Sequence, residues 1–143
     1  MDISYEEAVS TWLVADGRTL IAPQYPVRIG EATRSKPVRW PDILAVRPKD
    51  RQIFLCEVTW SKDWSRLCRK IDEYHDRLDD IRTSLDHWLG IGCAEWQVSV
   101  WYFVPEAHVD KIGSRRPYDG SFLKVTPLES IKPWTYAWGF REA

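Results

Sequence analysis

Apolar side chains recur at helical spacing in two parts of the chain. The first part follows Ser4 and Glu7, which form a capping-box signature, and it ends at Asp16-Gly17. The second part begins near Ser61 or Asp63 and runs to about Leu89. Its apolar positions alternate spacings of four and three: Leu67, Ile71, Tyr74, Leu78, Ile81, Leu85 and Trp88. The pattern predicts a short N-terminal helix and one long helix, which lies across a sheet or, alternatively, pairs with another helix.

Extended segments separate the two predicted helices. Residues 19–29 suit a strand, and the prolines within it predict that the strand is bent or lies at an edge. Residues 40–46 and 52–60 flank the turn residues Pro48-Lys49-Asp50, which is typical of a hairpin. The run 96–104 predicts a further buried strand that ends at Pro105. The residues after it mix a basic loop with extended and aromatic segments.

This order of elements, α-β-β-β-α-β, predicts an α/β fold with a mixed central sheet flanked by helices. A chain of 143 residues is long enough for one core and too short for two ordinary domains, so we expect a single domain over residues 1–143. There is no apolar run of transmembrane length and no signal-peptide pattern at the start. We therefore expect no membrane partner and a cytoplasmic location.

Net charge and cysteine content bear on which kinds of functional site the chain could contain. The chain has 20 basic and 21 acidic residues, so its overall charge neither predicts nor excludes a nucleic-acid partner. Its 3 cysteines form no Cys-x-x-Cys pair, which argues against a disulfide framework and a structural zinc site. Local clusters of charge must therefore identify the site.

The segment 53–60 places one carboxylate in an apolar setting. Alternation along it directs Ile53, Leu55, Glu57 and Thr59 to one face and the intervening residues to the other. Both faces are largely apolar, which predicts a central strand. An ionised Glu57 in such a strand is costly unless it is paired, hydrogen-bonded or bound to metal.

The preceding strand supplies a second carboxylate. A tight hairpin sets Val46 opposite Ile53 and Leu44 opposite Leu55, and the same register sets Asp42 opposite Glu57. Like charges in opposed positions repel, so this arrangement requires a cation between them or a proton on one acid. Two hard oxygen ligands favour Mg²⁺ or Mn²⁺. In one alternative interpretation, Asp42 merely starts the strand and Glu57 pairs with an arginine of the basic loop before the hairpin, which carries Arg28, Arg34 and Arg39. In another, both acids are structural and point to different faces.

The pair Trp40-Pro41-Asp42-Ile43-Leu44 and Phe54-Leu55-Cys56-Glu57-Val58-Thr59 resembles the paired motif of the PD-(D/E)XK, or restriction-endonuclease-like, superfamily. Pro41, Asp42 and Glu57 match that motif strictly, and the order of elements over about residues 4 to 104 is similar to the core of the family. The resemblance implies a restriction-endonuclease-like fold and a metal-dependent phosphodiesterase. Asp42, Glu57 and the Val58 carbonyl would hold Mg²⁺, which activates water and stabilises the developing charge. By the same likeness, Glu6 on the first helix could support a metal.

The chain departs from the family at one position. The lysine of the family stands two residues after the second acid, where this chain has Thr59. Lys62 at the end of the strand or Lys70 on the long helix could replace it. We favour Lys70, because it flanks the apolar seam that faces the sheet. Either lysine could instead be an ordinary solvated side chain.

Basic residues bracket the two acids along the chain and predict contacts to phosphates: Arg28, Arg34, Lys36, Arg39, Arg66 and Arg69. The first hypothesis is therefore a metal-dependent endonuclease that hydrolyses DNA phosphodiesters, related to junction or mobile-element nucleases. The second is a module that kept the nuclease fold, lost turnover and binds nucleic acid or a protein partner. A homodimer would fit either hypothesis, because one domain of this size covers few base pairs.

Overall fold

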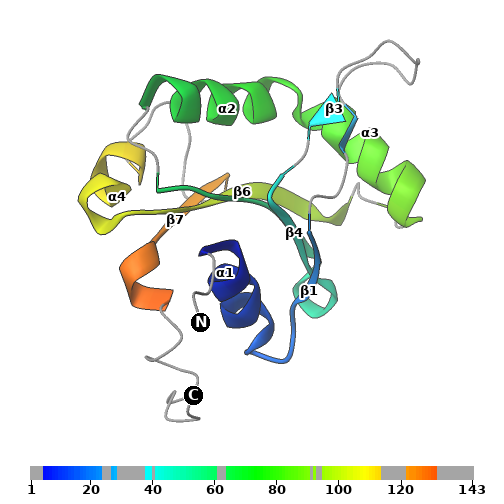
Figure 1. The fold of residues 1–143 in the computed structure, drawn as a ribbon. Coiled ribbons are helices and arrows are strands. Elements are labelled where there is room, and N and C mark those ends of the chain that lie inside the picture. The colour runs from blue at the N-terminus through cyan, green and yellow to red at the C-terminus, as the bar shows by residue number, and fades with distance from the viewer. Residues whose placement is uncertain are drawn as a thin grey trace.

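A five-stranded mixed sheet forms the centre of the computed structural model (Figure 1). The structure describes residues 5–23, 27–28, 38–39, 41–60, 64–90, 92, 95–113 and 122–131. The strand order is β1-β4-β5-β6-β7, antiparallel from β1 to β5 and parallel from β5 to β7. The strands span Leu20–Pro23 (β1), Ile43–Arg47 (β4), Gln52–Val58 (β5), Gln97–Val104 (β6) and Leu123–Pro127 (β7). The predicted mixed central sheet is confirmed, with β5 as its middle strand.

Helices cover both faces of this sheet (Figure 1). Helix α1 (Tyr5–Val14) lies on one face, and helices α2 (Trp64–Asp76) and α3 (Leu78–Leu89) lie on the other. Helix α4 (Glu106–Gly113) connects β6 to β7, and a 3-10 turn (Leu128–Ile131) follows β7. The α/β class with helices on both faces is therefore confirmed. Within the described ranges, no helix combines the length and apolar character needed to cross a membrane.

Each face of the sheet has its own apolar core, as the alternation along β5 predicts. Ile53 and Leu55 face α2 and α3, whereas Phe54 and Cys56 face α1. The core under α2 and α3 includes Leu67, Ile71, Tyr74, Ile81 and Leu85 of the predicted helical seam. The seam therefore packs on the sheet. Its burial stabilises the fold by about 1.5–3 kcal/mol for each fully buried large apolar side chain.

The hairpin has the predicted register. Val46 pairs with Ile53 and Leu44 with Leu55, and the last pair of the ladder joins Ile43 to Cys56. A 3-10 turn (Pro48–Asp50) connects the strands and ends at Arg51, whose φ of 53° is left-handed. Because the ladder stops at Ile43, Asp42 lies just before β4, beside the end of β5.

The prediction of one long helix over about residues 61 to 89 is wrong. The helix divides at Arg77, whose φ of −108° and ψ of 20° are not helical. The helical hydrogen-bond spacing nevertheless persists, because the Arg77 N–H donates to Glu73 and the Ile81 N–H to the Arg77 carbonyl. Tyr74 and Ile81, on either side of Arg77, are therefore both buried. The spacing of apolar residues is the same before and after the break, so the sequence pattern does not indicate it.

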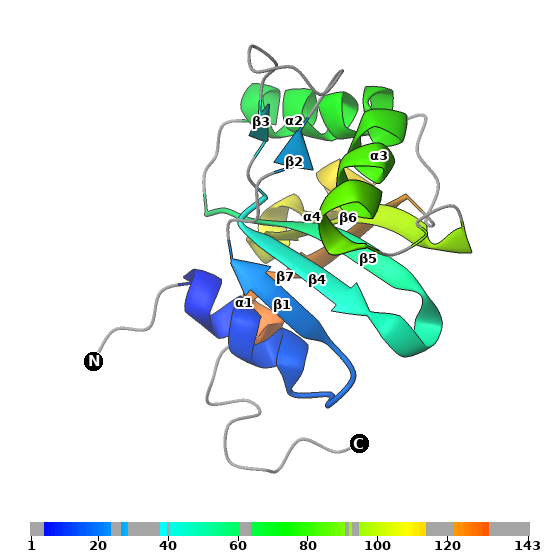
Figure 2. The same ribbon diagram turned by 90° about the vertical axis from the view of Figure 1, so that its right-hand side faces the viewer.

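Four further elements, β2 (Val27–Arg28), β3 (Val38–Arg39), α4 and β7, differ from the prediction. The segment 19–29, predicted as one strand, contains the edge strand β1 and the separate β2. β2 and β3 form a short antiparallel pair beside α3 (Figure 2). Helix α4 and strand β7 lie in the C-terminal part, for which the sequence predicts only a basic loop with extended and aromatic segments. The short β7 pairs in parallel with β6 and forms the second edge of the sheet, opposite β1.

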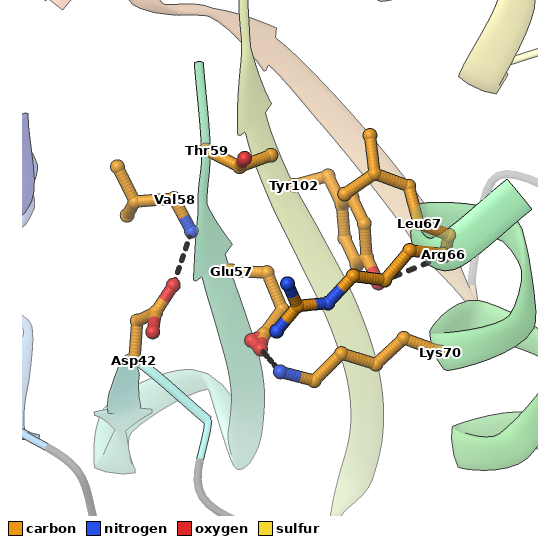
Figure 3. A pocket seen from close by; sticks show the side chains of 8 residues that line it. All are labelled: Asp42, Glu57, Val58, Thr59, Arg66, Leu67, Lys70 and Tyr102. Carbon is orange, nitrogen blue, oxygen red and sulfur yellow. Dashed lines mark hydrogen bonds and ion pairs between the residues drawn. The ribbon is translucent and has the colours of Figure 1, made fainter. Parts of the chain in front are cut away.

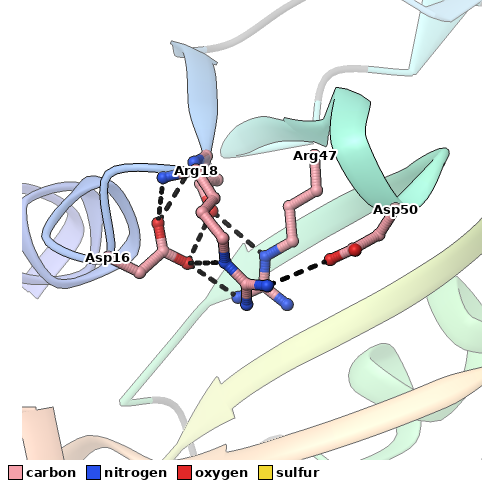
Figure 4. A network of polar contacts seen from close by, with 5 residues as sticks. Asp16, Arg18, Arg47 and Asp50 are labelled. Carbon is pink, nitrogen blue, oxygen red and sulfur yellow. Dashed lines mark hydrogen bonds and ion pairs between the residues drawn. The ribbon is translucent and has the colours of Figure 1, made fainter. Parts of the chain in front are cut away.

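A polar network closes the turn between α1 and β1 (Figure 4). The Asp16 carboxylate accepts hydrogen bonds from the Arg18 N–H at 2.8 Å, the Thr19 N–H at 3.1 Å and the Thr19 hydroxyl at 3.0 Å. Arg47 at the end of β4 donates to the Thr19 hydroxyl and lies 3.4 Å from Asp16. Asp16 therefore ties the end of α1 to the hairpin.

Candidate active site

A pocket of about 190 Å³ opens beside the carboxyl end of β5 (Figure 3). Its walls come from the residue before β4, the end of β5, the first turns of α2 and the middle of β6. The lining residues are Asp42, Glu57, Val58, Thr59, Arg66, Leu67, Lys70 and Tyr102. Both predicted acids and the favoured lysine therefore lie around one cavity, which we call the acid–lysine pocket.

Glu57 is the buried acid of this pocket, with 3% of its surface exposed. Its Oε1 pairs with Lys70 Nζ, whereas its Oε2 is buried without a hydrogen-bond partner in the described part of the chain. Burial raises the pKa of Glu57 to about 7; the Lys70 charge opposes this shift, and the Asp42 charge adds to it. The ionised carboxylate is thus only partly compensated by the groups around it.

Lys70 reaches the pocket from α2, one turn after Arg66 (Figure 3). Its side chain is 33% exposed, and its ammonium points to the Glu57 carboxylate. The structure therefore places a cation beside Glu57, although Thr59 occupies the position where the resembled family has its lysine. Lys62, the other predicted candidate, lies outside the described residues.

Asp42 has a structural contact of its own. Its Oδ2 accepts a hydrogen bond from the Val58 N–H at 2.8 Å, which extends the contact between the hairpin strands by one step beyond Ile43. Asp42 and Glu57 line the same pocket, so they lie on the same face of the hairpin. The alternative in which the two acids point to different faces is wrong.

The donor set fits a small divalent cation. The N–H and C=O of a strand residue point to the same side, so the Val58 carbonyl faces the side on which its N–H meets Asp42. Two carboxylates and a carbonyl are hard oxygen donors, and Mg²⁺ in proteins often takes only one or two carboxylates. The buried Oε2 of Glu57 has a free acceptor position. Among the described residues, no group of three or more His, Cys, Asp or Glu side chains is placed to hold a metal.

Glu6 is not part of the pocket lining. It lies exposed in the first turn of α1. Partial burial and, after it, the negative charge of Asp42 raise the pKa of Glu6, so the two carboxylates are close enough to repel. The structure thus places Glu6 on the α1 side of Asp42, near the predicted site but outside the cavity.

The predicted phosphate-contacting residues divide into three groups. Arg66 lines the pocket. Arg69 does not line it; its side chain is exposed and its Nε donates to the Ser65 carbonyl at 3.3 Å. Arg28 and Arg39 lie on the β2–β3 pair with undescribed side chains, and Arg34 and Lys36 lie outside the described residues.

Tyr102 lines the pocket but is not among the residues predicted from the sequence. It pairs with Glu57 across the parallel ladder between β5 and β6, and its hydroxyl donates to the Leu67 carbonyl at 3.3 Å. Burial raises the pKa of Tyr102 well above its usual range, so the hydroxyl stays protonated. A polar side chain inside the apolar run 96–104 was the signal that could have found it.

The chain is similar in structure to a solved protein of unknown function. No protein-family model and no curated protein sequence matches the chain. The crystal structure of AF1548, a protein of unknown function, is similar at 12% identity with a TM-score of 0.46. The similarity covers 92% of this chain and 59% of that chain. This chain therefore corresponds to less than two thirds of the length of that neighbour.

Proposed function

We propose that the protein is a metal-dependent nuclease that hydrolyses DNA phosphodiester bonds with Mg²⁺ or Mn²⁺. The observation that carries this proposal is the ion pair of Lys70 with Glu57 in the pocket that also contains Asp42. Two acids and one cation around a cavity are the groups that metal-assisted phosphodiester hydrolysis requires. The proposal includes a restriction-endonuclease-like form of the α/β fold.

Asp42, Glu57 and the Val58 carbonyl would hold the metal. A bound Mg²⁺ would supply Lewis-acid stabilisation of the phosphate and a more acidic water. Glu57 is suited to this role because its Oε2 is already desolvated and has no hydrogen-bond partner in the described residues. Asp42 would keep one oxygen on the Val58 N–H and offer the other, so that its orientation is set before any ligand binds.

Lys70 supplies the positive charge that Thr59 cannot. Its ammonium lies at the wall of the pocket, beside Glu57, where it would offset negative charge that develops on a bound phosphate. Three rotatable donors would also allow it to hydrogen-bond an attacking water. Arg66, one turn earlier on α2, would position the phosphate through its planar donor face.

A second candidate function is a nucleic-acid or protein-binding module without turnover. It is favoured by the contacts that the pocket already contains: Val58 uses one oxygen of Asp42, and Lys70 partly neutralises Glu57. Both acids would then serve the hairpin and α2 without any metal. Metal binding separates the two candidates.

Calorimetry with Mg²⁺ and with Mn²⁺, beside a nicking assay on plasmid and branched DNA, tests the proposal. Asp42→Asn and Glu57→Gln remove one charge each at nearly constant shape, and Asp86→Asn is the matched control because Asp86 is exposed on α3 outside the pocket. We expect both pocket variants to lose metal binding and cleavage together, while the control retains both. Metal binding without cleavage of either DNA would favour the module, and no metal binding in the presence of DNA would contradict the proposal.

A further inference from the structure

Two exposed aromatic side chains stack on each other at the end of β5. The Tyr5 and Trp60 rings lie with centroids 5.0 Å apart and an angle of 4° between their planes. Tyr5 is 45% exposed and Trp60 47% exposed, so a large part of each ring remains open to solvent. Mutual stacking holds both rings in one orientation, which lowers the entropy cost of binding a further flat group. We call this pair the Tyr5–Trp60 stack.

The stack lies at the same end of the sheet as the acid–lysine pocket. Trp60 follows Thr59, a lining residue of the pocket, and stands three positions after Glu57, a span of roughly 10 Å of extended chain. Alternation directs Glu57 and Thr59 toward the pocket and Trp60 toward α1. Tyr5 is the first residue of α1, which contacts both β4 and β5. A ligand that crosses the end of β5 would therefore meet both the pocket and the stack.

The charges around this end of the sheet orient such a ligand. Lys70 and Arg66 place positive charge on the α2 side of the pocket. The first turn of α1, beside Tyr5, carries the acidic residues Glu6 and Glu7. A nucleic-acid strand would thus direct its phosphates to α2 and its bases toward the aromatic rings of α1 and β5.

We propose that the Tyr5–Trp60 stack binds an unpaired base of a DNA strand whose phosphodiester enters the acid–lysine pocket. In a continuous duplex every base face is covered by its neighbours, so only a frayed end, overhang, flap or branch offers a free face to the rings. This inference rests on the proposed function and specifies its substrate class. The preferred substrate is DNA with a single-stranded stretch next to the cleavage site.

Fluorescence anisotropy in EDTA at one fixed salt concentration tests the binding step without cleavage. The probes are a fluorescein-labelled oligo-dT and a blunt duplex of equal length. We expect wild type to prefer the oligo-dT, and Tyr5→Leu/Trp60→Leu to weaken oligo-dT binding by about 10-fold or more, the usual loss for one base–aromatic stack. Duplex affinity should stay within about 2-fold, because it reports only the phosphate contacts.

Two further variants and one measurement on wild type separate stacking from folding. Trp60→Phe keeps a stacking ring and should retain most of the oligo-dT affinity. Leu20→Ala changes another exposed apolar side chain, 65% exposed on β1, and should leave both affinities unchanged. In wild type, an oligonucleotide that contains 5-iodo-deoxyuridine should photo-crosslink to Tyr5 or Trp60, as located by mass spectrometry.

The outcomes distinguish this inference from the proposed function. Oligo-dT binding that depends on the stack, without cleavage under Mg²⁺ or Mn²⁺, would leave the inference standing and contradict the nuclease proposal. If the protein cleaves DNA but Tyr5→Leu/Trp60→Leu does not change its affinity for oligo-dT, the nuclease proposal stands and the inference about the stack is contradicted. The inference would also be overturned if wild type bound neither probe, or if the double variant lost affinity for both probes equally. A change of oligomeric state in the double variant would overturn it as well.

Discussion

Lys70 on α2 and Glu57 on β5 form an ion pair inside the acid–lysine pocket, although 13 positions separate them in the sequence. The pair joins the helical and the sheet layers at the point where Asp42 also reaches the cavity. Because Lys70 is only one-third exposed and Glu57 is buried, each side chain restricts the position of the other. Lys70 therefore places a positive charge in the pocket from α2, whereas Thr59, after the end of β5, is uncharged.

Replacement of Lys70 tests whether this charge is catalytic. We expect Lys70→Met, which keeps the apolar stem, to lower the cleavage rate by about 100-fold or more, since preorganised charged donors contribute on that scale. Metal affinity should stay within about 10-fold, because Lys70 is not a metal ligand. The control is Arg69→Met on the adjacent, exposed position. Equal rates for Lys70→Met and Arg69→Met in single-turnover assays would exclude a catalytic role for Lys70.

The structural contact of Asp42 and its proposed role in metal binding can be tested separately. Asp42→Asn keeps an acceptor for the Val58 N–H, whereas Asp42→Ala removes it. We expect Asn to leave the free energy of unfolding near the wild-type value and Ala to lower it by about 1 kcal/mol. Both should lose Mg²⁺ and Mn²⁺ binding. Denaturant unfolding and calorimetry on the two variants check this, and metal binding retained in Asp42→Asn would remove Asp42 from the ligand set.

The raised pKa of Glu57 predicts how metal-free stability depends on pH. Burial lifts this pKa from its ordinary value of 4.5 to about 7, so the carboxyl group favours the folded state when it is protonated. The resulting stability is fully present below about pH 4.5 and is lost as the pH rises through about 7. The side chain of Glu57→Gln cannot ionise. As the pH rises from about 4.5 to above 7, the free energy of unfolding of this variant should therefore become a few kcal/mol higher than that of wild type.

Denaturant unfolding in EDTA at several pH values measures this difference. Glu106→Gln is the control, because Glu106 is exposed on α4. Its stability should follow that of wild type at every pH. Parallel pH profiles for wild type and Glu57→Gln would show that ionisation of Glu57 does not oppose folding.

Asp16 gives the opposite pH dependence. Burial alone would raise the pKa of Asp16, but hydrogen bonds from Arg18 and Thr19 and the charges of Arg47 and Arg18 together lower it below 3.8. The contribution of Asp16 to folding stability is thus present above about pH 3.8 and is lost as the pH falls through its lower pKa in the folded state. We expect Asp16→Ala to lower the free energy of unfolding by about 2 kcal/mol at neutral pH.

The difference between wild type and Asp16→Ala should shrink in acid. Asp50→Ala serves as the control, since Asp50 makes an exposed ion pair with Arg18 at 3.4 Å, worth at most about 1 kcal/mol. A loss for Asp50→Ala as large as that for Asp16→Ala would assign the stability to surface charge instead of to the closed turn.

The hairpin and the positions of its two acids could be predicted from the sequence because strand alternation and turn length both specify the same register. The alternation over residues 53–60 sets the two faces, and a short turn leaves one register that keeps Leu44 and Leu55 buried together. The same reasoning placed Asp42 and Glu57 on one face. The seam of α2 then directed Lys70 toward the sheet, since Lys70 adjoins the buried Ile71.

Other features carry no such periodic signal. The bend at Arg77 preserves the apolar spacing on both sides, so it leaves no trace in the pattern. Strand β7 has only 5 residues and includes the exposed Lys124, which is too short a run for alternation to identify. The pairing of Tyr102 with Glu57 depends on the parallel register between β5 and β6, which follows from packing of α2 and α3 and not from a local turn.

The acid–lysine pocket draws its four charged groups, Asp42, Glu57, Arg66 and Lys70, from the residue before β4, from β5 and from α2. Contacts between neighbouring segments close small loops, which costs little chain entropy and favours early formation during folding. The parallel strands β6 and β7 require longer crossovers and so have higher contact order. Divergence by insertion or replacement after β6 would therefore alter an edge of the sheet while the charged cluster, encoded between residues 42 and 70, is inherited as one contiguous unit.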